Sequence, residues 1–365
     1  MDTETLIIGA GIHGTSIAHR LGERSAVLDS QEPLAQWKRY TRNTGMTALR
    51  SGPVHHLGTQ QYELLWRQPP NEKSGQWLKA LHKDIRPRLQ FFNEHAQEIA
   101  DTVQPRWQCA TATAIHPIES GWRVETTRGD CSAYNVILAT GFAATPRIPE
   151  WAREREDTYH VFSDADIQGL PVQGQRVAVV GGGITAGQVA LSMHEKGANV
   201  TIISTHELQE KDVDSDPKYL RARELASFQA LPPETRVRIA RTQRYPGTMP
   251  WDVYRPLREL IRQGNIEHRV TQDEPNGTLS FDGRPADIAI LATGLTGAPG
   301  GTLLHQVENQ YGLQRIDEVP NTKNCRWAYG LYVSGTNAQA SLGPFAGNIW
   351  GAMQAGEAIE RQIRN

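Results

Sequence analysis

Two short glycine clusters are the residues whose types and spacing point most directly to chemistry. The first, Gly9-Ala10-Gly11-Ile12-His13-Gly14, has the pattern G-x-G-x-x-G. Gly9 permits a tight turn, Gly11 leaves room for a pyrophosphate beside the backbone, and Gly14 lets a helix pack closely on the preceding strand. Asp29 follows twenty residues after Gly9, where an acid is expected to bind a ribose hydroxyl. We predict a dinucleotide site here; the alternatives are a ligand-free turn and a helix-capping role for Asp29.

The second cluster, Gly181-Gly182-Gly183-Ile184-Thr185-Ala186, has the pattern G-x-G-x-x-A. The strand expected after it ends in Ser204-Thr205-His206, without a carboxylate, and Lys211 lies nearby. A carboxylate there would repel the 2′-phosphate of NADP, whereas hydroxyls and a cation accept it. We therefore predict an NADP site, with NAD as the alternative and a solvated loop as the alternative role of His206 and Lys211. The predicted binding residues are Gly181, Gly183, Thr185, Ala186 and His206.

Two dinucleotide sites in one chain say more than either site alone. The first cluster suits FAD and the second a nicotinamide nucleotide. A nicotinamide supplies hydride, and a flavin accepts it and passes the electrons on. An oxidoreductase that uses FAD and NADPH is therefore the leading hypothesis.

The elements that must position these clusters form two similar units. Strands are expected at 5–8, 25–28, 176–180 and 199–203, with helices at 12–21 and 184–196 between them. An antiparallel meander is expected between 109 and 138, and L-A-T-G closes each unit at 138–141 and 291–294. This predicts an α/β fold with two Rossmann-like domains on parallel sheets. The FAD-binding domain would span 1–165 and 296–365, with an NADPH-binding domain inserted at 172–295.

Other segments give weaker signals. Residues 33–60 show little periodicity and are expected to be loop, and 205–285 are only partly periodic. A helix is expected over 76–103, with Pro87 as a possible kink, and another over 349–363. By position, the N-terminus of that last helix would face the flavin and stabilise negative charge on it, although plain packing is the alternative.

Composition excludes several classes of function. Lys and Arg number 38 against 40 Asp and Glu, so no basic footprint for nucleic acid exists. The three cysteines, Cys109, Cys131 and Cys325, are far apart, which favours a reducing compartment. No apolar run is long enough to span a membrane, and no signal peptide or metal-binding pattern is seen, so we expect a cytoplasmic protein without a metal site.

Together, the two glycine clusters, the two L-A-T-G segments and the Gly335…Gly343-Pro344 ending resemble the two-dinucleotide-binding flavoproteins. This superfamily includes thioredoxin reductase, flavin-containing monooxygenases and ornithine/lysine N-hydroxylases. The segment from Thr44 to His56 resembles the loop beside the isoalloxazine in the monooxygenases, and 160–163 resembles their linker into the NADPH domain. The absence of C-x-x-C argues against the disulfide reductases, which need a dithiol.

The resemblance implies further site residues. Asn337 stands where the superfamily commonly has Asp, and it would contact the flavin. His55 or His56 could orient or protonate a reacting group, and Arg50 could bind a phosphate or a substrate carboxylate, with ordinary loop or surface roles as alternatives. The additional cofactor-binding residues predicted are Trp37, Thr140, Gly141, Gly294, Gly335, Asn337, Gly343, Phe345 and Ala346.

The resemblance favours a single-component monooxygenase that takes a small-molecule substrate and O2. It would oxygenate a heteroatom, preferably an amine nitrogen, through a C4a-peroxyflavin. One alternative is a reductase or dehydrogenase that passes electrons to a quinone, a small carrier or a partner protein. Another is a flavin-binding redox sensor without turnover.

Overall fold

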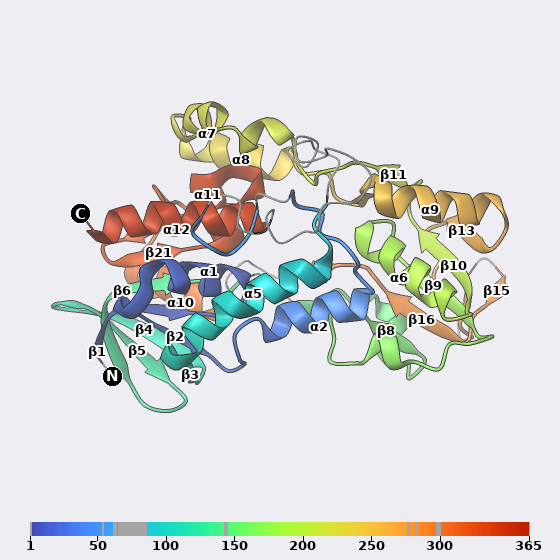
Figure 1. Ribbon diagram of the computed structural model, residues 1–365, viewed down its shortest axis with the longest axis horizontal. Helices are drawn as coiled ribbons and strands as arrows, with labels where there is room; N and C mark the ends of the chain where they lie inside the picture. Colours follow the sequence, from blue (N-terminus) through green and yellow to red (C-terminus); the bar gives the residue numbers. More distant parts are fainter. Residues whose placement is uncertain are drawn as a thin grey trace.

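Two β-sheets, the first mostly parallel and the second entirely so, lie side by side in the computed structural model (Figure 1), each with helices on its faces. The structure describes residues 2–52, 55–60, 64, 86–141, 145–275, 278–281, 283–296 and 301–364. Both ends of the chain lie on the half built around the first sheet.

The first sheet carries the first glycine cluster. Its strands run in the order β20-β21-β6-β1-β2-β3, and all neighbours except β20 and β21 are parallel. The antiparallel pair β4 and β5 joins it at β6, which is the predicted meander. The bounds are β1 Asp2–Ile8, β2 Ser25–Asp29, β3 Trp107–Cys109, β4 Ala112–Ile118, β5 Gly121–Thr126, β6 Cys131–Leu138, β20 Arg326–Ala328 and β21 Leu331–Val333.

Helices cover this sheet because each buries an apolar stripe on it. The helix α1 (Ile12–Leu21) packs against α5 (Leu89–Val103) and α12 (Ile349–Arg364). Buried side chains of the β1 strand, of α1 and of α12 belong to one hydrophobic cluster. The helix α10 (Gly301–Tyr311) packs on β4 of the meander.

The second sheet carries the second glycine cluster and is entirely parallel, in the order β13-β10-β9-β16-β8. Val, Ile and Ala dominate its strands, as expected when both faces are buried. Its helices α6 and α9 share the second large hydrophobic cluster. The bounds are β8 Thr158–His160, β9 Arg176–Val180, α6 Ile184–Glu195, β10 Asn199–Ser204, α9 Trp251–Arg262, β13 Ile266–Val270 and β16 Ile288–Leu291.

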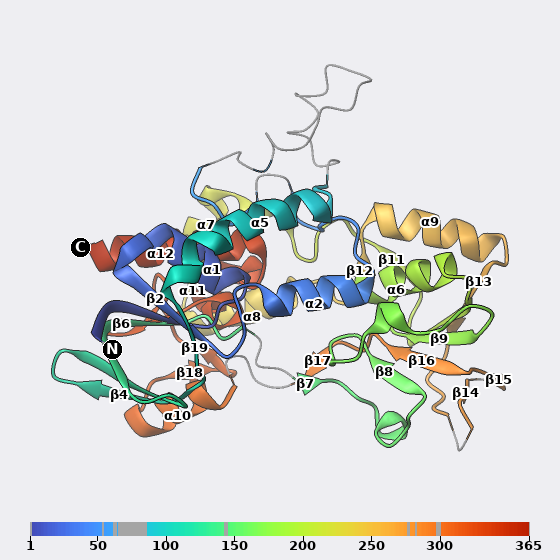
Figure 2. The ribbon, with the colours of Figure 1, turned by 60° about the horizontal axis from the view of Figure 1, so that its bottom comes forward.

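The two halves are joined by a narrow ribbon and pinned by a helix (Figure 2). The strands β7 (Thr145–Pro146) and β17 (Leu295–Thr296) pair antiparallel where the chain crosses between the halves. The helix α2 (Ala35–Thr44) reaches from the first half to α6 of the second. At its end, the amide of Asn43 donates to the carbonyl oxygens of Val161 and Ala165 at 3.2 and 2.8 Å.

An arm of the second half folds back over the first. It consists of residues 217–242 and contains α7 (Ala222–Gln229) and α8 (Pro233–Thr242). In Figure 1 these helices lie beside α11 (Gln339–Leu342) and α12, far from α6 and α9. Phe228 of α7 packs with Phe345 and Trp350, and Arg236 of α8 donates to the carbonyl oxygen of Ala340. The arm therefore packs across the boundary between the halves.

The predicted α/β fold with two Rossmann-like units and a meander is confirmed. The boundary of the first half differs from the expected one at residue 165. The strand β8 pairs with β16 and so belongs to the second sheet, and the chain passes between the halves at β7 and β17.

Some predictions for single segments were wrong. The expected loop at 33–60 contains α2. For 205–285 no elements were predicted, and the structure has α7, α8 and α9 there. Of the helix expected at 76–103, residues 76–85 lie outside the described residues, and α5 begins after Pro87, which therefore does not kink it. Within the described residues, we find no helix with the length and apolar character needed to cross a membrane.

Candidate functional site

The first glycine turn has the shape of a dinucleotide cradle. Gly9 adopts φ +110°, and a Cβ there would lie 2.4 Å from the carbonyl oxygen of Ala139. A Cβ on Gly14 would lie 1.7 Å from the carbonyl oxygen of Gly9, so the helix packs directly on the turn. A Cβ on Gly11, by contrast, would meet no atom within 4 Å. The backbone at Gly11 is thus open to a phosphate at the N-terminus of α1.

Asp29 stabilises this turn from the end of β2. One carboxylate oxygen accepts the backbone N–H of Ala10 at 2.7 Å, and the other accepts that of Gln31 at 2.9 Å. Asp29 does not cap α1, whose N-cap residue is Gly11. Each carboxylate oxygen can accept a further hydrogen bond, so the side chain is compatible with a ribose hydroxyl.

Polar groups from the C-terminal segment gather at the same edge of the sheet. His13 Nδ1 lies 2.8 Å from the hydroxyl of Ser334, which follows β21. Asn337 is fully buried, and neither its amide nitrogen nor its amide oxygen has a hydrogen-bond partner; the hydroxyl of Thr140 is also buried and unpartnered. Buried polar groups are rarely left unpaired, so these residues fit a polar ligand such as FAD. The nearby Gly141 and Gly335 adopt φ +66° and +71°, with open space where a Cβ would lie.

The segment before α12 is largely engaged in packing. The ring of Phe345 lies 6.1 Å from that of Trp350, in the cluster with the arm. Ala346 is fully buried in the core of the first half, and Gly343 faces Phe228. At this segment, a ligand could therefore be contacted through main-chain groups only.

The second glycine turn is built similarly but faces other groups. Gly181 has φ +147°, and a Cβ there would lie 2.6 Å from the carbonyl oxygen of Ala292. Gly183 is the N-cap residue of α6, and Ala186 is fully buried against the sheet. A Cβ on Gly182 would lie 2.8 Å from the ring of His206, which therefore lies on the turn itself.

A cleft of about 930 Å³ opens between the two halves, in front of the second turn. This volume is at the upper end of those found for small-molecule sites. Its walls come from α2, from α6, from the linker at Phe162 and from the segment after β21. The two segments that connect the arm to the second half also contribute, through Asp214 and residues 244–248. The residues that line it include Trp37, Tyr40, Thr41, Thr44, Met46, Arg50, Phe162, Gly183, Ile184, Thr185, Gln188, Asp214, Arg241, Arg244, Tyr245, Pro246, Gly247, Thr248, Ala292, Gly294, Glu318, Val319, Thr336 and Gln339.

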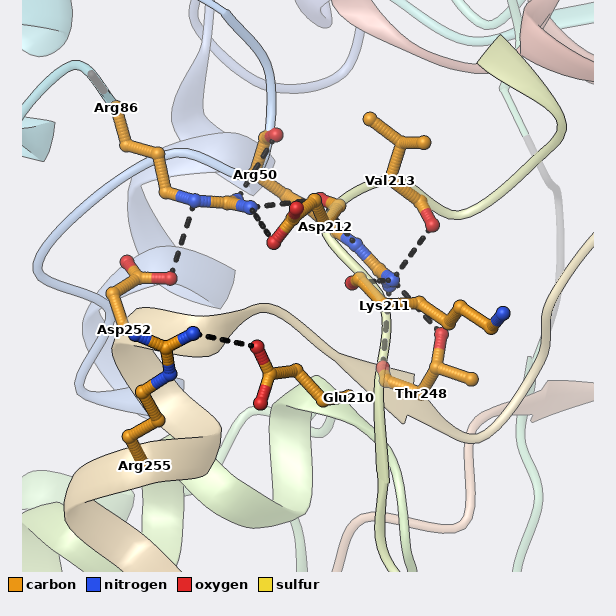
Figure 3. A network of polar contacts seen from close by, with 9 residues as sticks. All are labelled: Arg50, Arg86, Glu210, Lys211, Asp212, Val213, Thr248, Asp252 and Arg255. Carbon is orange, nitrogen blue, oxygen red and sulfur yellow. Dashed lines mark hydrogen bonds and ion pairs between the residues drawn. The ribbon is translucent and has the colours of Figure 1, made fainter. Parts of the chain in front are cut away.

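Arg50 lines this cleft, but its guanidinium is engaged by the backbone of the second half (Figure 3). Nη2 donates to the carbonyl oxygens of Lys211 and Val213 at 2.8 and 3.0 Å. Nη2 and Nη1 also donate to the hydroxyl and the carbonyl oxygen of Thr248, at 2.8 and 3.2 Å. Burial lowers the pKa of Arg50 from its usual value, an effect that Asp214 opposes. These contacts favour a role in holding the halves together.

Of the two adjacent histidines in the first half, His55 is partly exposed and His56 is buried. His56 is fully buried, accepts the backbone N–H of Gly58 at 3.1 Å, and packs edge-on against His95. Burial, together with the smaller effect of the neighbouring His56, lowers the pKa of His55 to about 4. Neither is among the described residues that line the cleft.

Trp37, in contrast, lines the cleft from α2, where its indole N–H donates to Asn93 at 2.9 Å. Several other cleft residues were not predicted. Tyr40 stands on the helix that the sequence did not reveal, and Arg241, Arg244 and Tyr245 come with the arm and its return. The Pro246-Gly247 pair is a turn signal that could have drawn attention to this return.

Comparison with known proteins places this geometry in context. A Baeyer-Villiger monooxygenase of Streptomyces coelicolor is 30% identical over 119 residues, which are 32% of this chain. The match spans only 20% of that monooxygenase.

Among solved structures, an ornithine N-hydroxylase from Kutzneria sp. 744 is similar, with a TM-score of 0.73 and 16% identity, covering 100% of this chain and 99% of that one. The bacillithiol disulfide reductase of Bacillus cereus has a TM-score of 0.66 and 18% identity, with the same coverage of both chains. At these identities the likeness establishes a shared fold.

The family model for pyridine nucleotide-disulphide oxidoreductases matches residues 6–247, which is more than half of the chain and contains both glycine turns. The chain therefore belongs to the pyridine nucleotide-disulphide oxidoreductase family.

Proposed function

We propose that this chain is an FAD-containing, NADPH-using monooxygenase that oxygenates an amine or another soft heteroatom of a small substrate. The observation that carries the proposal is the cleft between the two halves, which residues of the second turn line. One wall is the N-terminus of α6 with Thr185, and the opposite wall is the segment after β21 with Thr336 and Gln339. A nicotinamide and a flavin bound at the two turns would meet in this space.

The first half would hold FAD and the second half NADPH. Gly11 and the N-terminus of α1 would receive the FAD pyrophosphate, Asp29 a ribose, and Asn337 a polar group of the flavin. The NADPH pyrophosphate would lie at the N-terminus of α6 beside Thr185, because the Cα of Gly247 lies 3.4 Å from the Cβ position of Gly183 and covers it. When bound, FAD would supply hydride acceptance and oxygen activation, chemistry that side chains lack.

The chain's own contribution is a cleft lined by aromatic residues and by charged residues of both signs. Trp37, Tyr40, Phe162 and Tyr245 present rings to the cleft and limit the access of water. Asp214 and Glu318 also line it. Arg241 and Arg244 line the cleft as well, and Arg244 pairs with Asp214 at 3.3 Å, so the charge of the lining does not by itself select an amine over an acidic substrate.

A reductase is the second candidate, because the fold is shared with a bacillithiol disulfide reductase. The thiols argue against a dithiol mechanism. Cys131 and Cys325 are buried, Cys109 is half-buried, none forms a disulfide, and none is among the described residues of the cleft. Thiols that form no disulfide fit a reducing compartment, and we propose the cytoplasm.

Anaerobic titration of the purified FAD-loaded protein with NADPH, followed by air, separates the candidates. A monooxygenase bleaches the flavin with NADPH and then consumes O2 with formation of a hydroxylated product from L-ornithine, L-lysine or cadaverine. A reductase bleaches equally but turns over only with an added quinone or disulfide. A flavin that NADPH does not bleach overturns both.

A further inference from the structure

A second cavity lies between the arm and the first half, and it is separate from the cleft. Its volume is about 560 Å³, which is within the range of small-molecule sites. The arm contributes Gln229 of α7 and Arg236 of α8, and the first half contributes residues 321–323 and 326–329. Among the described residues, none lines both this arm pocket and the cleft. A ligand of the arm pocket would therefore not be the molecule that reacts in the cleft.

The charged side chains of the arm pocket are all positive. Arg236, Lys323 and Arg326 line it, and no Asp or Glu is among the described residues that do so. Lys323 and Arg326 form no ion pair with any other residue that the structure describes. Burial lowers the pKa of Arg236 and Glu234 opposes this effect, but Glu234 is exposed and does not line the pocket. A concave surface that carries one sign of charge attracts an anion.

Lys323 and Arg326 stand directly opposite each other across a tight turn. The backbone N–H of each donates to the carbonyl oxygen of the other, at 3.1 and 3.0 Å. The side chains of such an antiparallel pair leave the ribbon on the same face, where like charges destabilise each other. Between them, Asn324 and Cys325 both adopt positive φ, +51° and +65°. A bound anion would offset the repulsion that this turn imposes.

Arg236 places a buried cation with unused donors in the same pocket. The residue is 8% exposed. Its Nη1 donates to the carbonyl oxygens of Thr322, at 3.3 Å, and of Ala340. Its Nε is buried without a hydrogen-bond partner, and Nη2 is accessible and has no partner among the described residues. Buried polar groups are rarely left unpaired, and a guanidinium is suited to binding carboxylate or phosphate oxygens.

The walls of the arm pocket are held in place without a ligand. The N–H of Cys325 donates to the hydroxyl of Ser341 at 2.9 Å, and that hydroxyl lies 2.8 Å from the hydroxyl of Thr322. The amide of Gln229 donates to the carbonyl oxygen of Ser341 at 3.0 Å. The turn, α7 and α11 are thus connected around the pocket, so little ordering is required when a ligand enters.

We propose that the arm pocket binds the phosphate group of a small phosphorylated molecule, with Arg236 at its base and Lys323 and Arg326 at its mouth. A phosphate monoester carries more negative charge and more acceptor oxygens than a carboxylate, and so matches a set of cations better. The cavity is larger than a phosphate group alone would fill, and it leaves room beside the exposed Tyr329 for the organic part. The ligand would bridge the arm and the first half.

Calorimetric titration of the full-length, FAD-loaded protein with ribose 5-phosphate tests the proposal. We expect saturable binding with a Kd of about 1 mM or lower. Ribose should not bind, and D-ribonate, which carries a carboxylate instead of a phosphate, should bind at least about fivefold more weakly. K323Q/R326Q should raise the Kd of ribose 5-phosphate at least about fivefold, and R236M at least about tenfold.

R223Q/R238Q is the matched control, because it removes the same charge from exposed positions of the arm that do not line the pocket; it should bind as wild type. Lys323 and Arg326 are exposed, so K323Q/R326Q keeps the test valid even if R236M does not fold. A wild-type protein that does not bind ribose 5-phosphate overturns the proposal, and so does an unchanged Kd in K323Q/R326Q. An equal loss in R223Q/R238Q, or equal binding of ribonate, overturns it as well.

Discussion

The imidazole Nδ1 of His13 and the hydroxyl of Ser334 lie 2.8 Å apart, although 321 residues separate them in the sequence. This contact joins the first glycine turn to the end of β21 and so closes the predicted flavin site from both ends of the chain. Burial lowers the pKa of His13 to about 4, an effect that the Gly347 backbone partly offsets.

Acid should therefore destabilise the flavin-free protein in a defined window. The unfolded chain takes up a proton at His13 near pH 6.5, but the folded chain does so only near pH 4. The contribution of neutral His13 to the unfolding free energy is fully present above pH 6.5 and is lost as the pH falls toward 4. Urea unfolding measures how much unfolding free energy each protein loses between pH 7 and pH 4.5. H13N should lose roughly 1 to 2 kcal/mol less than the wild type loses. Equal losses would contradict this assignment, and S334A, which keeps the imidazole, should retain most of the pH dependence.

Two glycine variants should separate ligand binding from folding at the first turn. G11A places a methyl group in open space, so its thermal midpoint without flavin should stay within about 2 °C of wild type. Its FAD affinity should fall at least tenfold, because the methyl group occupies the approach to the backbone. G14A places the same group 1.7 Å from a carbonyl oxygen and should lower the thermal midpoint strongly. Unchanged flavin content in G11A would place the pyrophosphate elsewhere.

Asn337 should stabilise the FAD complex at the expense of the empty protein. The amide of Asn337 is buried and unpartnered, so N337L replaces an unsatisfied polar group by an apolar side chain of similar size. The flavin-free variant should be as stable as wild type or more stable by about 1 kcal/mol, while FAD binding weakens about tenfold. Denaturation of the flavin-free protein and fluorescence titration with FAD measure the two effects. A less stable flavin-free variant with normal FAD affinity would show that Asn337 serves the fold alone.

The ion pair between Arg86 and Asp252 should be worth more than a surface pair. R86M leaves the Asp252 carboxylate partly buried without its cation and should cost about 2 to 3 kcal/mol of unfolding free energy. Burial already raises the pKa of Asp252 above its usual value, against the opposing effect of Arg86. D252N in the R86M background should restore about 1 kcal/mol, because it removes the unpaired charge. A double variant no more stable than R86M would mean that Arg86 acts instead through its hydrogen bonds to the carbonyl oxygens of Arg50 and Asp212.

The nucleotide turns could be predicted from the sequence because their chemistry is local. Gly9, Gly14 and Gly181 occupy positions where a Cβ would meet a backbone oxygen, so the pattern of glycines reports the geometry directly. The strands β9 and β10 of the second sheet could also be predicted, since burial on both faces requires continuous apolar runs. The strands β8 and β13 carry polar residues and were not predicted.

The helix α2 and the role of Arg50 could not be predicted in this way. The buried residues of α2 are Thr41, Asn43 and Thr44, so the helix has no apolar stripe to reveal it. The partners of Arg50 are mostly carbonyl oxygens, which every residue carries and no sequence pattern marks. Its position at the junction of the halves depends on how the arm returns.

The placement of the arm has a consequence for how such a chain can diversify. Residues 217–242 leave and re-enter the second half but build part of the surface of the first, through Phe228 and Arg236. Neither half would then be a complete folding unit if expressed by itself. If relatives exchanged the arm and kept the two segments that connect it to the second half, one side of the cleft would change. Both glycine turns would stay as they are.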